Sequence, residues 1–542
     1  MLEEEKKEQR NMMLALALVC VILFAFNKFT APASEQITVP LEPQQEVAVI
    51  EEQPQAIDVT TLKASEEEPT AITFENDFVN GAFLPTTTTV NALELVTYRQ
   101  TTEPDSPAVE LLSPAFYTRL NWSGFEGIVP QVIGEKLTPE NPITLVWAKD
   151  NIRLERTIQL DNAYLMTYTD KLTNGSGQSF QATLTGQVIR QADSIKQERT
   201  SVHEGFLGLF NNREEEVRYN DIKEDKPQTL ENKGGWIGQT DKYWQAIFVP
   251  DQETTVNMRF AKVGEDFISS FEAPITVGAG ETITRTTRLF AGAKELQLIN
   301  DYEKQGIPRF DLSIDFGWYY FLTKLFLYFL GWSYALVGNM GVVILIFATL
   351  IRIAMLPIAT KSYESMAKMK KVQPKIKVLQ EQFKNDPQRL RLEIMNLYKR
   401  DKVNPASGCL PMFIQIPVFF ALYKVLSVSI LMRQAPFFGW IHDLSQPDPS
   451  SVFTAFGYLP WPIPSFLNLG VWPILMGLTM VIQQRLNPSP TTSKDQKIMM
   501  NMMPIIFTFM LGNFASGLVI YWAWSNILSI AQQKYIMKKV GV

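Results

Sequence analysis

The chain has 542 residues, of which 46% are hydrophobic, and a formal net charge of −6; this length accommodates two or three domains. The charge is uneven, because residues 29–351 carry 25 Lys and Arg against 44 Asp and Glu, which leaves the rest strongly basic. The only histidines are His203 and His442 and the only cysteines are Cys20 and Cys409, so no Cys/His metal cluster or Ser/His/Asp set is expected; we predict no cofactor and no enzymatic reaction.

The N-terminal segment allows two interpretations. Lys6, Lys7 and Arg10 precede an apolar run, Met12–Phe26. A signal peptide would use the small residues at 30–33 as its cleavage site. A retained anchor would keep the run as a first membrane span, near the lower limit of length for one. The segment by itself does not decide between them.

Residues 31–70 form a predicted linker. They are rich in Pro, Gln and Glu, with one lysine and little periodicity. Such a composition cannot bury a core and repels itself, which is typical of a disordered tether.

A period of two begins at about residue 71 and continues to 308. In one example, Phe180, Ala182, Leu184, Gly186 and Val188 alternate with polar neighbours. Turn signals, such as those at 174–175 and 233–235, separate these runs. Repeated strands without long helical patterns between them predict an antiparallel β-sandwich. We see no catalytic group in it and favour a scaffold or partner-binding module.

The C-terminal part is apolar and helical. Residues 316–333, which include the aromatic run Trp318–Trp332, are predicted to lie along the membrane interface. Five predicted spans follow, at Val337–Ile358, 408–432, 466–486, 498–512 and 514–533. The expected fold is therefore a polytopic helical membrane protein with a five-helix core in 337–542, an N-terminal anchor in 1–30 and a β-sandwich.

Basic segments alternate with uncharged ones across these spans. Residues 361–407 hold twelve Lys and Arg against five acids, whereas 434–465 hold no Lys or Arg. Because cytoplasmic loops carry the excess of basic residues, both termini are predicted in the cytoplasm and the β-domain outside it, in the periplasm.

Arg352 is the most informative single residue, because it lies inside the first of the five spans. A central arginine costs roughly 2.5–3.5 kcal/mol on insertion scales and usually faces a bundle interior or a wet cavity. Thr349, Gln415, Ser525 and Asn526 are polar companions on the same or other spans, so a hydrophilic groove is one interpretation. Snorkelling toward the headgroups is the other. For Lys424, nearer the outer end of its span, snorkelling is the preferred interpretation.

The basic stretch 361–407 has the pattern of a helical hairpin. Pro374 predicts a kink or break, and 385–387 (Asn-Asp-Pro) predicts a cap that begins a second helix. The function suggested for the hairpin is docking of clients, ribosomes or anionic lipid, and simple determination of topology is the alternative. The candidate docking residues are Lys368, Lys370, Lys371, Lys375 and Lys377.

Several longer motifs resemble the YidC membrane protein insertases. They are the arginine-bearing span that ends at Met355-Leu356-Pro357, SMAKMKKVQPKI (365–376), KVNPASGCLPMFIQIPVFFALY (402–423), RQAPFFGWIHDLS (433–445) and SGLVIYW (516–522). The region of resemblance that contains these motifs runs from about 316 to 533, about 40% of the chain. The acidic β-domain resembles that of the Gram-negative branch, which implies six spans and hence a retained anchor.

The resemblance implies that the protein inserts and folds new inner-membrane proteins through a groove open to cytoplasm and lipid. Arg352 would be its positive charge, and Gln415 and Asn526 would wet it. The family often has paired tyrosines in the last span, where this chain has Tyr521 and Trp522, so one hydroxyl of the lining is replaced. The implied partners are nascent membrane proteins, the Sec translocon, the ribosome with the signal recognition particle pathway, and the phospholipid bilayer, without sequence-specific nucleic-acid binding.

Two other classes remain as rivals. A secondary transporter requires inverted repeats and broken helices that meet at the midplane, and we find no convincing repeat. An envelope enzyme requires a convergent catalytic group in 71–308, which the sequence does not offer.

Overall fold

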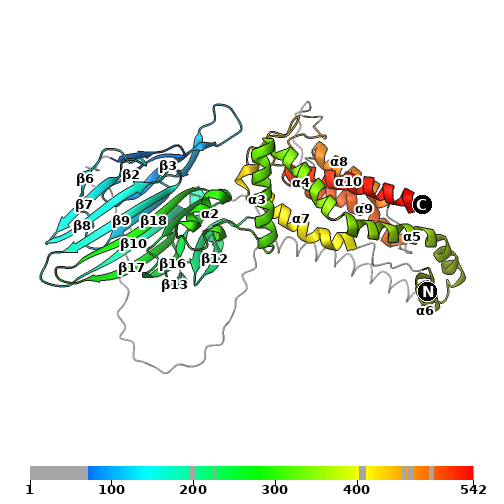
Figure 1. Ribbon diagram of the computed structural model, residues 1–542, viewed down its shortest axis with the longest axis horizontal. Coiled ribbons are helices and arrows are strands. Elements are labelled where there is room, and N and C mark those ends of the chain that lie inside the picture. The colour runs from blue at the N-terminus through cyan, green and yellow to red at the C-terminus, as the bar shows by residue number, and fades with distance from the viewer. Residues whose placement is uncertain are drawn as a thin grey trace, which may run out of the picture. The chain divides into compact units, whose positions relative to one another are not determined.

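The computed structural model describes residues 71–195, 202–224, 226–401, 410–454, 456, 459, 469–486 and 494–540. The predicted anchor (1–30) and linker (31–70) lie outside these residues. The chain divides into two compact units, one formed by the β-strands and one that contains the helices from Lys294 onward together with 100–107. Figure 1 shows both.

Two antiparallel sheets of nine strands each make up the first unit. The first sheet has the order β1 (Ile72–Glu75), β2 (Val79–Leu84), β3 (Thr89–Arg99), β5 (Phe116–Trp122), β10 (Phe180–Gln191), β17 (Asp266–Val277), β16 (Thr255–Val263), β13 (Gln228–Lys233), with β4 (Ala108–Leu112) paired to β3. The second has the order β12 (Arg213–Arg218), β11 (Gly205–Phe210), β14 (Trp236–Thr240), β15 (Trp244–Val249), β18 (Thr282–Ala293), β9 (Leu165–Asn174), β8 (Ile152–Leu160), β7 (Ile143–Lys149), β6 (Gln131–Ile133). The predicted β-sandwich is confirmed.

The alternation in β10 shows why this sequence forms a sandwich. Ala182, Leu184, Gly186 and Val188 are buried, and their polar neighbours are partly exposed, because successive side chains in a strand point to opposite faces. Gly186 is required by its cross-strand neighbour: a Cβ there would lie 2.1 Å from a ring carbon of Phe271.

A fully buried ion pair in the second sheet is hydrogen-bonded to the first sheet. Arg156 on β8 donates to both carboxylate oxygens of Asp170 on β9, each at 2.7 Å, and Trp122 of the other sheet donates to the same carboxylate at 2.6 Å. The guanidinium also donates to Thr88 and to the carbonyl of Leu120. Because every charge in this cluster has partners, the desolvation cost is offset locally.

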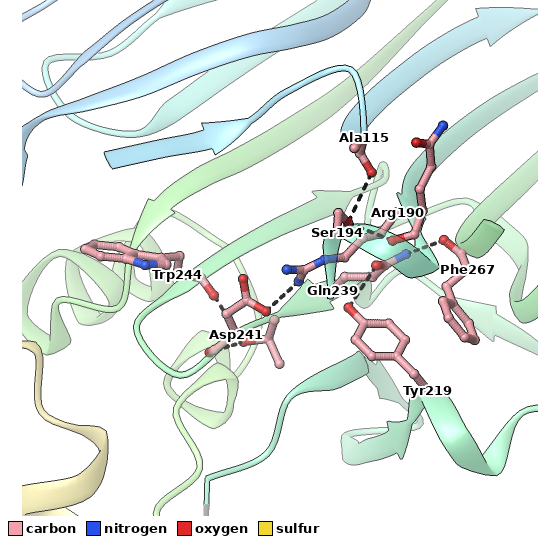
Figure 2. Close-up of polar contacts among 10 residues, drawn as sticks. Ala115, Arg190, Ser194, Tyr219, Gln239, Asp241, Trp244 and Phe267 are labelled. Carbon is pink, nitrogen blue, oxygen red and sulfur yellow. Dashed lines mark hydrogen bonds and ion pairs between the residues drawn. The ribbon is translucent and has the colours of Figure 1, made fainter. Parts of the chain in front are cut away.

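A second polar cluster lies farther along the sandwich (Figure 2). Gln239 donates to the carbonyls of Val188 and Phe267 in the opposite sheet, and its oxygen accepts from the hydroxyl of Tyr219. Arg190 pairs with Asp241 at 2.5 Å. Burial raises the pKa of the Tyr219 phenol well above its usual range, so this hydroxyl stays protonated and keeps donating.

The second unit is helical. Its elements are α2 (Leu296–Lys304), η4 (Phe310–Ser313), α3 (Tyr320–Val337), α4 (Met340–Ala354), α5 (Leu356–Gln382), α6 (Pro387–Arg400), α7 (Leu410–Val428), η6 (Ile430–Met432), α8 (Val471–Leu486), α9 (Lys494–Leu511) and α10 (Ser516–Val540). Helices α4, α7, α8, α9 and α10 overlap the five segments predicted as spans, with bounds that differ by several residues. Gly477 lets α8 approach α9, because a Cβ there would lie 2.0 Å from the Thr508 hydroxyl.

Judged by length and composition alone, α3 is the one described helix that is long and apolar enough to cross a membrane. Helices α4 and α5 would provide a second crossing if this pair, bent by 65°, counted as one span. Residues Gln415–Val428 and Ile498–Leu511 are shorter apolar helical stretches.

Two local predictions are corrected by the helices. The span predicted at Val337–Ile358 ends at Ala354, because the chain bends there and Pro357 lies in the first turn of α5, where its missing N–H is not needed. Of the kink or break predicted at Pro374, the break does not occur, because α5 continues through this residue. The proline is exposed, so water can satisfy the carbonyl that loses its partner.

Candidate functional site

Helix α10 collects most of the predicted site residues. Tyr521, Ser525 and Ser529 are spaced by four residues and therefore lie on one face, and all three are buried. Trp522 and Asn526 lie on an adjoining face. The helix packs against α4, α5, α7 and α8, so its polar side chains meet those of four other helices.

Arg352 in the last turn of α4 reaches across to this face. Its Nε and Nη2 atoms donate to the Ser525 hydroxyl at 3.2 and 2.8 Å. The guanidinium is partly buried, and no carboxylate of the described residues lies within ion-pairing distance of it. A hydroxyl stabilises a cation without neutralising it, so none of the described residues neutralises this positive charge.

The other predicted residues form separate contacts around the same helix. Gln415 on α7 donates to the Tyr521 hydroxyl at 3.1 Å, while its own oxygen is buried without a partner in the part of the chain described. The Asn526 amide donates to Thr479 of α8 at 3.1 Å. Each of these amides thus links two helices, as buried polar groups in membranes commonly do.

Thr349 and Trp522 complete the predicted set. The Thr349 hydroxyl donates to the Leu345 carbonyl at 2.8 Å and accepts from the Trp524 indole at 3.0 Å. Trp522 packs edge-on against Phe419, with ring centroids 4.7 Å apart. The structure therefore brings Arg352, Gln415 and Tyr521 close to one face of α10, and places Asn526 and Trp522 beside it.

Sequence reasoning missed Thr479, Trp524 and Ser529 as members of this cluster. Ser529 is buried and donates to the Ser525 carbonyl at 2.8 Å. The spacing of Tyr521, Ser525 and Ser529 was a usable signal, since small polar residues at every fourth position mark one face of a helix. Trp524 and Thr479 carried no such pattern.

Lys424 differs from Arg352 in having a charged partner. Its ammonium pairs with Asp315, and the two side chains are only 15% and 14% exposed. Snorkelling stays a prediction for Lys424, and the structure adds an anionic partner that the sequence did not reveal. Among the described residues of this unit, Lys424 thus has a carboxylate partner, whereas Arg352 has none within ion-pairing distance.

Helix α3 is held at its N-terminal end by a similar arrangement. Asp311 of η4 accepts hydrogen bonds from Tyr320 and, at 2.5 Å, from Lys324. Burial alone would raise the pKa of Asp311, but these hydrogen bonds outweigh it and hold the pKa below its usual range. The outward stripe of the helix is apolar: Trp318, Phe321, Leu325, Trp332 and Leu336 are more than half exposed.

We expect the stabilisation of α3 by Asp311 to depend on pH. A carboxylate with a lowered folded-state pKa stabilises the fold above its unfolded pKa, near 4, and loses that contribution as the pH falls through the folded value. Asp311→Asn at neutral pH should likewise speed hydrogen exchange of the first turns of α3, about tenfold. The control is Asp301→Asn, which removes an exposed pair with Lys304. Equal hydrogen-exchange rates of the first turns of α3 in both variants would show that Asp311 does not stabilise this end of the helix.

The basic hairpin consists of α5 and α6. Asp386 caps α6 by accepting from the Arg389 N–H at 3.0 Å, with Pro387 at the first helical position, as predicted. Buried Met369, Val372, Ile376 and Leu397 form the contact between the two helices. The five candidate lysines, Lys368, Lys370, Lys371, Lys375 and Lys377, are all exposed, and Lys375 pairs with Asp401 at 2.8 Å.

These features define a class of protein, a helical membrane core with a buried polar cluster and a separate β-sandwich. Comparison with known families gives the particular one. Residues 71–329 match the family described as the YidC periplasmic domain, and 332–541 match the 60Kd inner membrane protein family. The chain is 43% identical to the membrane protein insertase YidC of Brucella suis over 494 residues (87% of this chain, 81% of the relative). It is 38% identical to that of Rhizobium meliloti over 574 aligned positions (99% and 96%).

The chain therefore belongs to the YidC family of membrane protein insertases, inner-membrane proteins with a periplasmic domain. Among solved structures it is similar to one described as an active YidC insertase with the first transmembrane domain resolved. That comparison has 17% identity and a TM-score of 0.38, and covers 86% of this chain and 92% of the other.

Proposed function

We propose that the polar cluster around α10 is the client-binding groove of this insertase. In this proposal the groove opens to the cytoplasm and the lipid and is closed to the periplasm. It receives the polar tail of a new membrane protein while the client's apolar segment moves into lipid. The lining comprises Arg352, Thr349, Gln415, Tyr521, Trp522 and Asn526, together with Ser525.

The uncompensated charge of Arg352 is the observation that carries the proposal. Arg352 follows Met340 by twelve residues and Ser525 follows Ser516 by nine, so the pair lies roughly 14–18 Å from the starts of α4 and α10. That is about half of a hydrocarbon core of roughly 30 Å. A cation held at this depth by a hydroxyl alone supports a water-accessible hollow.

The physical driving force needs no covalent step and no cofactor. Transfer of the client's apolar segment from water to lipid is favourable by itself. The obstacle is the polar tail, and fixed donors half-way into the membrane shorten the dry distance that it must cross. At an effective dielectric constant of 20, a carboxylate 4 Å from the guanidinium gains about 4 kcal/mol, so acidic tails benefit most.

The remaining partners belong to the same proposal. The insertase acts alone or beside the Sec translocon, and the exposed lysines of the hairpin receive ribosome-bound chains or chains delivered by the signal recognition particle. Both termini are cytoplasmic. Charge supports this side for the hairpin, because residues 361–407 hold twelve basic and five acidic residues.

Site-specific photocrosslinking tests the groove. A photoreactive residue at 349, 415 or 522 should form adducts with the apolar segment of a stalled single-span client. The matched control is position 353: Ile353 is next to Arg352 but 59% exposed on the outside of α4. Adducts at 353 but none at the three lining positions would overturn the groove and favour a transporter.

A further inference from the structure

The outer face of α6 is a surface that the proposed groove does not use. The inner face of the helix is occupied, because Leu390, Ile394, Leu397 and Tyr398 point to the side that packs on α5 or to its flank. At 100° per residue, the opposite side carries Gln388, Arg389, Leu392, Met395, Asn396, Lys399 and Arg400, with Arg391 at one edge and Glu393 at the other. All of them are exposed except Glu393, which is half-buried.

This outer face is both cationic and apolar. Three of its seven residues are basic and none is acidic, and at its edges Arg391 adds a fourth cation and Glu393 an acid. Leu392 and Met395 lie among the basic residues and remain 59% and 53% exposed. Neither Arg391 nor Lys399 has an ion-pair partner among the described residues, whereas Arg400 pairs with Asp401. Exposed leucine and methionine surrounded by cations are typical of helices that lie in a membrane interface.

The bend at the end of α4 brings this helix toward such an interface. Helices α4 and α5 meet at 65°, so if α4 stands along the membrane normal, α5 lies within about 25° of the membrane plane. From Lys361 to Gln382 it is then about 32 Å long but rises only about 13 Å. With α4 in that orientation, α5 runs close to the headgroups instead of projecting straight into the cytoplasm.

We propose that the outer face of α6 docks on anionic phospholipid of the cytoplasmic leaflet. Arg391 and Lys399 contact lipid phosphates, and Leu392 and Met395 insert between headgroups and acyl chains. Nucleic acid is the less suitable occupant, because phosphate contacts would leave the two apolar side chains in water. On α5, Lys370 and Lys377 are two turns apart on the side opposite the α6 contact, and they remain free for clients.

Docking can be measured without any client, in the full-length protein reconstituted in nanodiscs. Cys20 and Cys409 are replaced by serine, and an environment-sensitive fluorophore is attached at Asn396→Cys on the outer face. The matched control is Glu381→Cys, an exposed position on α5. Lipids that carry a quencher should quench the label at 396 in anionic nanodiscs, much less in neutral ones, and at 381 in neither.

Two double variants separate the contributions. Arg391→Gln with Lys399→Gln should reduce the docked-to-undocked ratio about thirtyfold in anionic nanodiscs, since each cation near such a surface contributes about 1 kcal/mol. Leu392→Ser with Met395→Ser should make quenching at 396 shallower in anionic nanodiscs. A label at 396 that is quenched no more than at 381, or equally in neutral and anionic lipid, overturns the proposal. A fluorescence change of the label at 396 on addition of ribosomes, without quenching by lipid, would also overturn the proposal and assign this face to RNA.

The inference rests on the cytoplasmic side proposed for the hairpin but not on the role of Arg352. If lipid docking fails while crosslinks form at 349, 415 and 522, only the outer face of α6 has been misassigned. If docking succeeds while the crosslinks fail, the groove is wrong and the lipid contact stands.

Discussion

Arg352→Glu should abolish insertion of clients whose translocated tail is acidic, and Arg352→Ala should slow it by up to about 10³-fold. The reason is the Coulomb term: a cation–carboxylate pair at 4 Å contributes about 4 kcal/mol at an effective dielectric constant of 20, and each 1.4 kcal/mol is a factor of ten. The measurement is the initial insertion rate of a single-span client into proteoliposomes. Arg352→Lys, which keeps the charge, should retain most of the rate.

The control for this experiment is the client itself. The insertion rate of a client with a neutral tail should depend far less on residue 352. Such a tail is not attracted by the positive charge and benefits only from the water in the groove. Lys424→Gln removes a cation that already has an anionic partner, Asp315, and should not discriminate between acidic and neutral tails. Native rates for acidic tails in both Arg352→Ala and Arg352→Glu would exclude the proposed role of the charge.

The second large effect is expected in the β-sandwich. Removing one partner of the Arg156–Asp170 pair leaves an uncompensated charge in a site where both side chains are 1% exposed, which costs about 3–5 kcal/mol. In Asp170→Ala, amides of β8 and β9 that exchange only by opening of the whole sandwich should therefore exchange about 10²- to 10³-fold faster. Hydrogen exchange in the full-length chain measures this.

A surface ion pair provides the comparison. Lys233 and Glu253 are 2.8 Å apart but 62% and 87% exposed, so Glu253→Ala should change the same exchange rates by less than about fivefold. Replacing both buried partners together, as Arg156→Met with Asp170→Leu, should recover part of the loss, because no charge is then left unpaired. Equal effects of Asp170→Ala and Glu253→Ala on these exchange rates would show that the buried pair stabilises the sandwich no more than an exposed one.

Proximity is what could not be foreseen from the sequence. Arg352 and Ser525 are 173 residues apart, and the hydrogen bond between them depends on the packing of α4 against α10. The same holds for Lys424 and Asp315, whose pairing the sequence did not reveal. The sequence shows which polar residues lie inside an apolar run, but it does not show which residues they contact.

Period-two alternation, apolar runs and the asymmetry of basic residues predicted the strands, the apolar helices and the hairpin from the sequence alone, because each pattern lies within one short segment. The pairing of the strands does not, since Phe180 of β10 pairs with Val277 of β17. The longer sequence motifs of the C-terminal part indicated the YidC family. Only the tertiary structure decided which cations are compensated, where α4 bends away from α5, and that the outer face of α6 stays uncovered. These depend on contacts between distant segments, whose free energies local sequence does not encode.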